Sequence, residues 1–208
     1  MRRPAIIFDF GNVIAFFDYR KACDELGRPL GLSGEAFLDR VRPLGFSDRV
    51  KRYEAGGMTA EAFSAAIGEL AGSAIPHETF AAAWSDIFTP NEPVAELAAE
   101  LKAGGYRLVL GSNTNDLHAA QFRAQFAETL AHFDRLVLSY EVGHIKPSAE
   151  FYLACSDAAG MPPGDCLFID DMAENVEGAR AAGLQGLRYR DPPALRAELR
   201  GLGVEVAA

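Results

Sequence analysis

The sequence predicts an α/β fold, a doubly wound, Rossmann-like parallel sheet with an inserted helical cap. Short apolar runs alternate with segments of helical period through most of the chain, as expected when buried strands alternate with covering helices. Residues 18–89 interrupt this rhythm, because amphipathic segments follow one another there without a strand pattern between them. We therefore expect a core domain at residues 1–15 and 90–208 and a helical cap domain at residues 16–89.

The spacing of apolar residues predicts the individual elements. Continuous apolar runs predict core strands at residues 5–9, 106–111, 135–139, 166–170 and 186–189. Helical spacing predicts core helices at residues 92–103, 148–159 and 172–182, and the segment at 191–208 is interpreted as a closing helix with a short tail. The same spacing predicts helices inside the insertion at residues 35–44, 59–71 and 77–88.

Composition limits the possible partners and the compartment. The 208 residues are 49% hydrophobic, which is enough for a full core and excludes a disordered chain. The net charge of −9 argues against nucleic acid or an anionic membrane as a partner, because both require a clustered basic surface. The three cysteines lack CxxC spacing and are typical of a reducing, cytoplasmic environment. A small-molecule substrate is the expected partner, and the sequence does not indicate an oligomeric state.

The first candidate functional residue is Asp9, which ends the apolar run at 5–8 and is followed by the turn residue Gly11. A carboxylate at the end of a buried strand can act as a nucleophile or hold a cation. The alternative interpretation, a polar turn leaving the strand, is equally compatible with this segment alone.

Two further candidates carry a hydroxyl and a cation. Ser112 follows a predicted strand and precedes Asn113 at the start of a predicted helix, where amides and a hydroxyl suit a phosphoryl oxygen. Taken alone, a serine at this position is more often a simple helix cap. Lys146 stands directly before Pro147, which fixes the entry to the next helix, although an isolated lysine is usually only solvated.

The adjacent acids Asp170 and Asp171 end the run at 166–169. Two neighbouring carboxylates at a buried strand end repel each other unless a cation is present, so this pair predicts a metal site. A helix cap would explain Asp171 but not Asp170 as well.

The order of these segments resembles the haloacid dehalogenase-like (HAD) hydrolase superfamily over the whole chain: strand-Asp, helical insertion, strand-Ser, Lys-Pro and strand-Asp-Asp. The Asp-Phe-Gly-Asn-Val opening at 9–13 and Ser-Asn-Thr-Asn at 112–115 are similar to a helical-cap bacterial sugar-phosphatase branch that includes an α-D-glucose-1-phosphate phosphatase. The resemblance implies a Mg²⁺-dependent phosphatase that hydrolyses small phosphomonoesters such as glucose 1-phosphate.

The resemblance also implies a role for each candidate. Asp9 would attack phosphorus and form an aspartyl-phosphate. Mg²⁺ would be held by Asp9, the Gly11 carbonyl and Asp171, with Asp170 acting directly or through water. Phosphoryl oxygens would be bound by Ser112, the Asn113 amide and Lys146. Asn175 would orient the acidic loop rather than contact the substrate.

One position departs from the family pattern. Most phosphatases of this superfamily carry an acid–base aspartate two residues after the nucleophile, where this chain has Gly11. We therefore expect a bias towards substrates with good leaving groups, such as sugar 1-phosphates. His144 or a cap residue could supply the proton instead. Cap residues that could set specificity are Phe16, Phe17, Tyr19, Phe46, Arg49, Arg52 and Tyr53, although aromatic residues at helical spacing are more often core.

Three other readings remain open from the sequence. A 2-haloacid dehalogenase would also attack with an aspartate and lack the second acid, but it would not need the Asp170-Asp171 pair. A phosphomutase would need an acid–base residue at Gly11. A catalytically weak phosphate-binding module would be expected to have lost more than one catalytic position.

Overall fold

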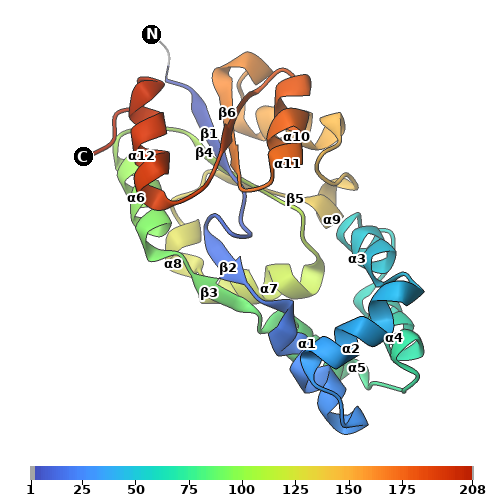
Figure 1. Ribbon diagram of the computed structural model, residues 1–208. Helices are drawn as coiled ribbons and strands as arrows, with labels where there is room; N and C mark the ends of the chain where they lie inside the picture. Colours follow the sequence, from blue (N-terminus) through green and yellow to red (C-terminus); the bar gives the residue numbers. More distant parts are fainter. Residues whose placement is uncertain (1–2, 208) are drawn as a thin grey trace.

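The computed structural model describes residues 3–207, so Met1, Arg2 and Ala208, at the ends of the expected core segments, lie outside it. Its centre is a five-stranded parallel sheet in the order β5-β4-β1-β6-β7 (Figure 1). The strands are β1 (Ala5–Phe8), β4 (Leu108–Ser112), β5 (Arg135–Leu138), β6 (Cys166–Asp170) and β7 (Gln185–Arg188). The sheet confirms the predicted doubly wound α/β class.

Helices cover both faces of the sheet because successive residues of a strand point to opposite sides. On β1, Ile6 and Phe8 join one apolar cluster, while Ala5 and Ile7 join another. The first cluster includes α6 (Glu92–Ala103), α7 (Asp116–Gln125) and α12 (Pro192–Gly201). The second includes α10 (Ala149–Ala159) and α11 (Ala173–Ala181). Shorter elements are α8 (Ala127–Leu130), α9 (Ser139–Val142) and the 3-10 turn η3 (Pro163–Asp165).

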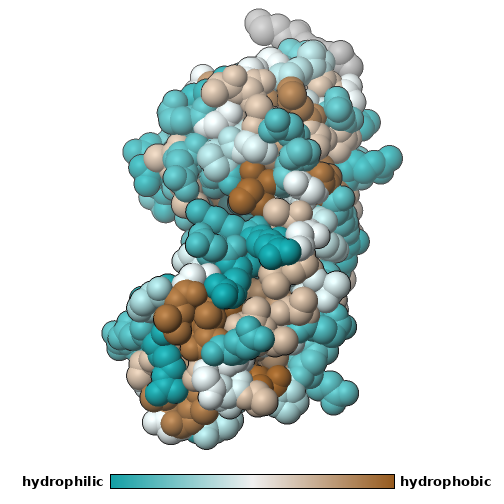
Figure 2. Space-filling view, turned by 90° about the vertical axis from the view of Figure 1, so that its right-hand side faces the viewer, coloured by the Kyte–Doolittle hydropathy of each residue, from teal (hydrophilic) through white to brown (hydrophobic). Residues whose placement is uncertain are grey.

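A second group of helices lies beyond one end of the sheet (Figure 1). It contains α1 (Tyr19–Gly27), α2 (Gly34–Val41), α3 (Phe46–Glu54), α4 (Ala60–Ala71) and α5 (His77–Ser85), with 3-10 turns η1 (Arg28–Leu30) and η2 (Arg42–Leu44). We call α1 to α5 the cap. A short antiparallel ribbon, β2 (Ala15–Phe17) and β3 (Phe88–Pro90), carries the chain into the cap and back. Figure 2 shows the molecule narrowing between its two parts, with hydrophilic side chains gathered there.

Aromatic side chains join the cap to the helices of the sheet. Trp84 of α5 stacks on His118 of α7 with ring centroids 5.3 Å apart and an interplanar angle of 10°. Tyr19 of α1 lies 5.1 Å from Trp84, and Phe88 of the ribbon lies 5.3 Å from His118. Trp84 and His118 are both buried. The apolar core is therefore continuous from the sheet into the cap.

Two helix ends in the insertion differ from the prediction by three residues each, more than the other boundaries do. The helix expected at 77–88 ends at Ser85, because Phe88 pairs with Phe17 in the ribbon, whose strands are too short for a sequence signal. The helix expected at 35–44 is α-helical only to Val41, and Pro43, which lacks an N–H, lies in the 3-10 turn that follows. The division at residues 15/16 and 89/90 falls within the ribbon and stays a prediction. None of the helices in residues 3–207 has the length and hydropathy needed to cross a membrane.

Candidate active site

The three aspartates meet at the carboxyl end of the sheet because β1 and β6 are neighbours. Phe8 lies opposite Ile169, and the Asp9 N–H donates to the Ile169 carbonyl at 2.9 Å. Asp9 and Asp170 therefore leave adjacent strands side by side, although 160 residues separate them in the sequence. The Phe10 N–H donates to Asp9 Oδ1 at 2.7 Å and orients the carboxylate. Topology thus brings distant acids to one site, as the sequence predicted.

Lys146 lies between two of these carboxylates. Its Nζ is 2.7 Å from Asp9 Oδ1 and 2.7 Å from Asp170 Oδ2, and its side chain is buried. Burial lowers the pKa of Lys146, but Asp9 and Asp170 raise it by more, so its pKa lies above the ordinary value. Burial raises the pKa of Asp9, while Lys146 lowers it. The lysine is a fixed cation, not a solvated one.

The side chain of Asn113 fixes the backbone of Lys146. The Lys146 N–H donates to Asn113 Oδ1 at 2.8 Å, and Asn113 Nδ2 donates to the Lys146 carbonyl at 3.1 Å. Asn113 directly follows β4, so this pair ties the lysine loop to the sheet. The sequence suggested a role only for the main-chain amide of Asn113.

Asp170 is fully enclosed by donors. Asn175 Nδ2 lies 3.0 Å from both of its carboxylate oxygens, and the Met172 N–H donates to Oδ1 at 2.9 Å. With Lys146 on Oδ2, both oxygens are in use. Asn175 thus holds the Asp170 carboxylate, and because it also lines the cavity, the expectation that it does not contact the substrate stays a prediction.

Asp171 is more open and is held by Asn12. Asn12 Nδ2 donates to Asp171 Oδ2 at 3.2 Å, from a left-handed backbone with φ of 56° that asparagine tolerates. Burial raises the pKa of Asp171, and the hydrogen bond from Asn12 lowers it. Carboxylate oxygens of Asp9, Asp170 and Asp171 lie within 4.8 Å of one another. This all-oxygen donor set fits a hard divalent cation such as Mg²⁺.

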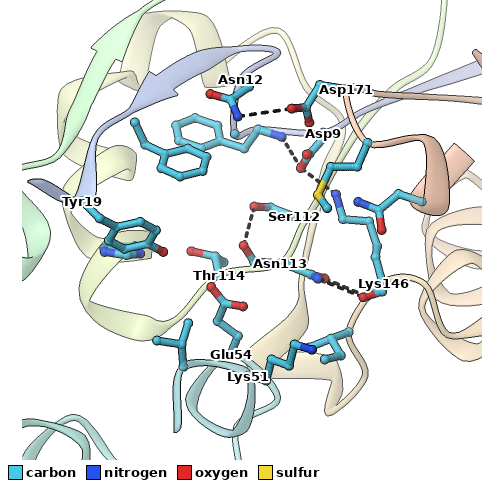
Figure 3. Close-up of a pocket in the computed structure, with 18 of the residues that line it drawn as sticks. Asp9, Asn12, Tyr19, Lys51, Glu54, Ser112, Asn113, Thr114, Lys146 and Asp171 are labelled. Carbon is cyan, nitrogen blue, oxygen red and sulfur yellow. Dashed lines mark hydrogen bonds and ion pairs between the residues drawn. The ribbon is translucent and has the colours of Figure 1, made fainter. Parts of the chain in front are cut away.

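These residues line a cavity of about 520 Å³ (Figure 3). Asp9, Gly11, Ser112, Asn113, Lys146 and Asp171 all face it, while Asp170 lies behind them. Ser112 is buried at the end of β4, and among the described residues 3–207 its hydroxyl makes only a long contact of 3.4 Å to the Asn113 carbonyl. The cap closes the other side with Phe46, Ser47, Val50, Lys51 and Glu54.

The cap candidates divide into two groups. Phe17, Tyr19 and Phe46 line the cavity. The others do not: Phe16 is exposed, Tyr53 stacks on Phe63, and Arg49 and Arg52 donate to backbone carbonyls of the cap. His144 is exposed and is not among the cavity residues.

Sequence reasoning missed Asn12, the side chain of Asn113 and Glu54. Asn113 directly follows the last residue of β4, and Asn12 lies in the turn after β1, so both positions were usable signals. Glu54 is the last residue of the cap helix α3, just before Gly56-Gly57. No pattern in the sequence shows that this end of the helix lines the cavity.

A parallel sheet with aspartates and a buried lysine converging at its carboxyl edge defines a hydrolase-type active site. The family model of haloacid dehalogenase-like hydrolases matches residues 4–183. The chain therefore belongs to the haloacid dehalogenase-like hydrolases.

Individual relatives agree with this assignment. A D-ribitol-5-phosphate phosphatase of Bacteroides thetaiotaomicron is 27% identical over 201 residues, which cover 93% of this chain and 95% of the relative. A HAD family enzyme of the same organism, solved with magnesium and inorganic phosphate, has a TM-score of 0.75 at 23% identity, covering 91% and 95% of the two chains. An L-2-haloacid dehalogenase of Xanthobacter autotrophicus has a TM-score of 0.68 at 20% identity, covering 99% and 85%. Both structures share the fold of this chain.

Proposed function

We propose that this hydrolase is a Mg²⁺-dependent phosphatase of small phosphomonoesters, with Asp9 as its nucleophile. The observation that carries the proposal is the convergence of Asp9, Asp171 and Lys146 with Ser112 on one cavity. A phosphate dianion needs cations and donors around it, and Lys146, the Ser112 hydroxyl and the Asn113 amide are the groups at hand.

The hydrogen bonds of Asp9 favour one of its oxygens for attack. Oδ1 already accepts from the Phe10 N–H and lies 2.7 Å from Lys146 Nζ. Oδ2 has neither of these contacts, so we assign the attack on phosphorus to Oδ2. An aspartyl-phosphate intermediate would split one difficult displacement into two easier ones.

The residues that would hold Mg²⁺ are Asp9, the carbonyl of Gly11 and Asp171. Within residues 3–207, the Gly11 carbonyl accepts no hydrogen bond, so it is free for this purpose. Asp170 has both oxygens occupied by Lys146, Asn175 and Met172, which favours a contact through water. The ion would offset negative charge on the nucleophile and the phosphate.

Sugar or polyol phosphates are the substrates that the cavity suits best. Its volume of about 520 Å³ lies within the range for small-ligand sites. Tyr19, Phe46 and Val50 give it an apolar side, while Lys51 and Glu54 offer polar groups to hydroxyls. The relative that acts on D-ribitol 5-phosphate supports a polyol phosphate, and the sequence motifs support glucose 1-phosphate. The division into core and cap would let the cap set this preference.

The test is phosphate release from D-ribitol 5-phosphate and from α-glucose 1-phosphate, with and without Mg²⁺. The blank is Asp9→Asn, which keeps the shape of the side chain but removes the nucleophile. Metal-dependent release by the wild type, absent in the variant, is the expected result. Release of chloride from 2-chloropropionate without metal, together with no phosphate release, would instead identify a dehalogenase.

A further inference from the structure

Position 11 leaves this phosphatase without the usual acid, and the structure shows that the space beside it is filled. A Cβ atom on Gly11 would stand 2.9 Å from Cε1 and 3.2 Å from Cδ1 of Phe17. A carboxylic acid there would require the Phe17 ring to move. Any proton donor for the leaving group must therefore come from elsewhere in the cavity.

Glu54 is the acid that the cap brings into the cavity. It is the last residue of α3, and Figure 3 shows its carboxylate rising from the cap towards Thr114, with Asp9 on the other side of the cavity. In an in-line displacement the leaving oxygen points away from the nucleophile. A leaving group displaced by Asp9 therefore faces the cap, where Glu54 stands.

Three contacts hold this end of α3 against the core. The Tyr53 hydroxyl donates to Asp116 at the start of α7. The Ser139 hydroxyl donates to the Glu54 carbonyl at 2.6 Å. Gly56 packs so closely on the backbone of Tyr140 that a Cβ atom would stand 2.5 Å from its carbonyl oxygen. These contacts involve main chain and neighbouring residues, so they fix Glu54 without occupying its carboxylate.

The surroundings of Glu54 suit proton transfer in both directions. Within residues 3–207, no hydrogen bond or ion pair reaches its carboxylate. The charged or titratable groups that face it are Lys51 on its own helix, Lys146 from the core and Tyr19 from α1. Burial raises the pKa of Glu54 to about 7, although Lys146 and Lys51 lower it. Acid–base catalysts work best when their pKa lies near the working pH.

We propose that Glu54 is the general acid and general base of this active site, in place of an aspartate at position 11. The inference rests on the proposed phosphatase function. In the first step, Asp9 Oδ2 bonds to phosphorus, the P–O bond to the leaving group breaks, and the protonated Glu54 gives its proton to that oxygen. In the second step, the Glu54 carboxylate takes a proton from water as the water oxygen bonds to phosphorus. The bond between phosphorus and Asp9 Oδ2 then breaks, which releases phosphate and restores the Asp9 carboxylate.

The decisive comparison uses Glu54→Gln with two substrates of different leaving-group acidity. An alkyl phosphate, D-ribitol 5-phosphate, needs a proton on its departing oxygen, whereas p-nitrophenyl phosphate does not. We expect kcat on the alkyl phosphate to fall by about 10²–10⁴-fold and the first step on the aryl phosphate to change little. Glu61→Gln, an exposed acid on α4, is the matched control and should leave both rates unchanged.

A second readout separates catalysis from a structural or substrate-binding role. Without a base, the aspartyl-phosphate should hydrolyse slowly, so Glu54→Gln should release one equivalent of p-nitrophenolate in a burst before a slow steady state. Glu54→Asp retains a carboxyl group and should recover part of the alkyl rate. A melting temperature close to that of the wild type would show that the variants are folded.

The outcomes distinguish failure of this inference from failure of the proposed function. If the wild type releases phosphate but Glu54→Gln slows the first step equally on both substrates, or slows it on neither, Glu54 is not the acid. If Glu54→Gln raises KM and leaves kcat unchanged, Glu54 serves in substrate binding, and this result would also overturn the inference. If neither the wild type nor any variant exceeds the Asp9→Asn blank on either substrate, the proposed phosphatase function itself fails.

Discussion

The side chain of Asn113 bonds to both main-chain groups of Lys146: its Oδ1 accepts from the Lys146 N–H at 2.8 Å, and its Nδ2 donates to the Lys146 carbonyl at 3.1 Å. The lysine that neutralises two carboxylates is thus positioned by an amide at the end of the neighbouring strand β4. Lys146 lies in a loop but is held in a fixed position by its bonds to the end of the sheet. A charged group stabilises a reacting group best when its position is fixed in advance.

Replacing Asn113 with alanine should therefore reduce catalysis more than stability. The loss of two hydrogen bonds, about 1–3 kcal/mol together, would let Lys146 move from the carboxylates. We expect kcat to fall by about 10–100-fold, measured by steady-state phosphate release. Gln125→Ala removes another amide-to-carbonyl hydrogen bond, on α7 to Phe88, and should leave kcat unchanged.

Adding Mg²⁺ should stabilise the protein through the aspartate cluster. A ligand at 100 times its Kd stabilises the folded state by about 2.7 kcal/mol, which a thermal melt detects readily. Asp171→Asn should abolish most of the rise in melting temperature, because it removes the most accessible carboxylate of the cluster. Asp157→Asn, an exposed change on α10, should retain the full rise. An equal rise in both variants would place the ion elsewhere.

Gly56 and Gly72 offer a matched pair of cap substitutions. Both have positive φ, 71° and 72°, so alanine at either costs about 1–2 kcal/mol in backbone strain. At Gly56 the new Cβ also meets a backbone atom, the Tyr140 carbonyl oxygen, whereas no atom of residues 3–207 lies within 4 Å of a Cβ at Gly72. We expect Gly56→Ala to unfold at lower denaturant and to lose kcat, and Gly72→Ala to lose stability alone.

His118 should make the protein less stable in mild acid. Its ring lies between the Trp84 carbonyl, 2.9 Å from Nε2, and Asn115 Nδ2, 3.0 Å from Nδ1, which fits the neutral ring with its proton on Nε2. Burial lowers the pKa of His118 to about 4, so between that value and about 6.5 the unfolded chain binds the extra proton. Stability is thus fully present above pH 6.5 and is lost as the pH falls.

The size of this effect can be measured by urea unfolding. We expect about 2 kcal/mol of the free energy of unfolding to disappear between pH 7 and pH 5 because of this residue. His118→Gln, which can still donate and accept, should show a smaller decrease. His144→Gln, at an exposed position, should follow the wild type. Identical pH dependence in all three proteins would contradict the assignment.

The sequence predicted the core elements because their patterns are local. The runs ending at Asp9 and Asp170 are apolar on every residue, as in strands covered on both faces. The β2–β3 ribbon escaped prediction because its strands have three residues each and are stabilised by pairing across the whole insertion.

Most of the chemistry of the site was predictable because it follows strand ends, and Lys146 was predictable from the proline that comes after it. Asp9, Ser112, Asp170 and Asp171 share that position, and the parallel sheet then brings them together. Glu54 depends instead on how α3 packs against Tyr140 and Ser139, a contact across more than 80 residues that leaves no periodic trace. Asn175 could be assigned to the acidic loop because it lies within the same strand–helix turn as the acid it holds.

The stack of Trp84 on His118 has a consequence for substrate exchange. Swinging the cap away would expose these rings and their neighbours, and aromatic burial of this size is worth several kcal/mol. We therefore expect the cap to stay packed on the core during turnover, so that substrate exchange does not require these rings to separate. A cavity that keeps its shape in this way would select substrates by how well they fit it.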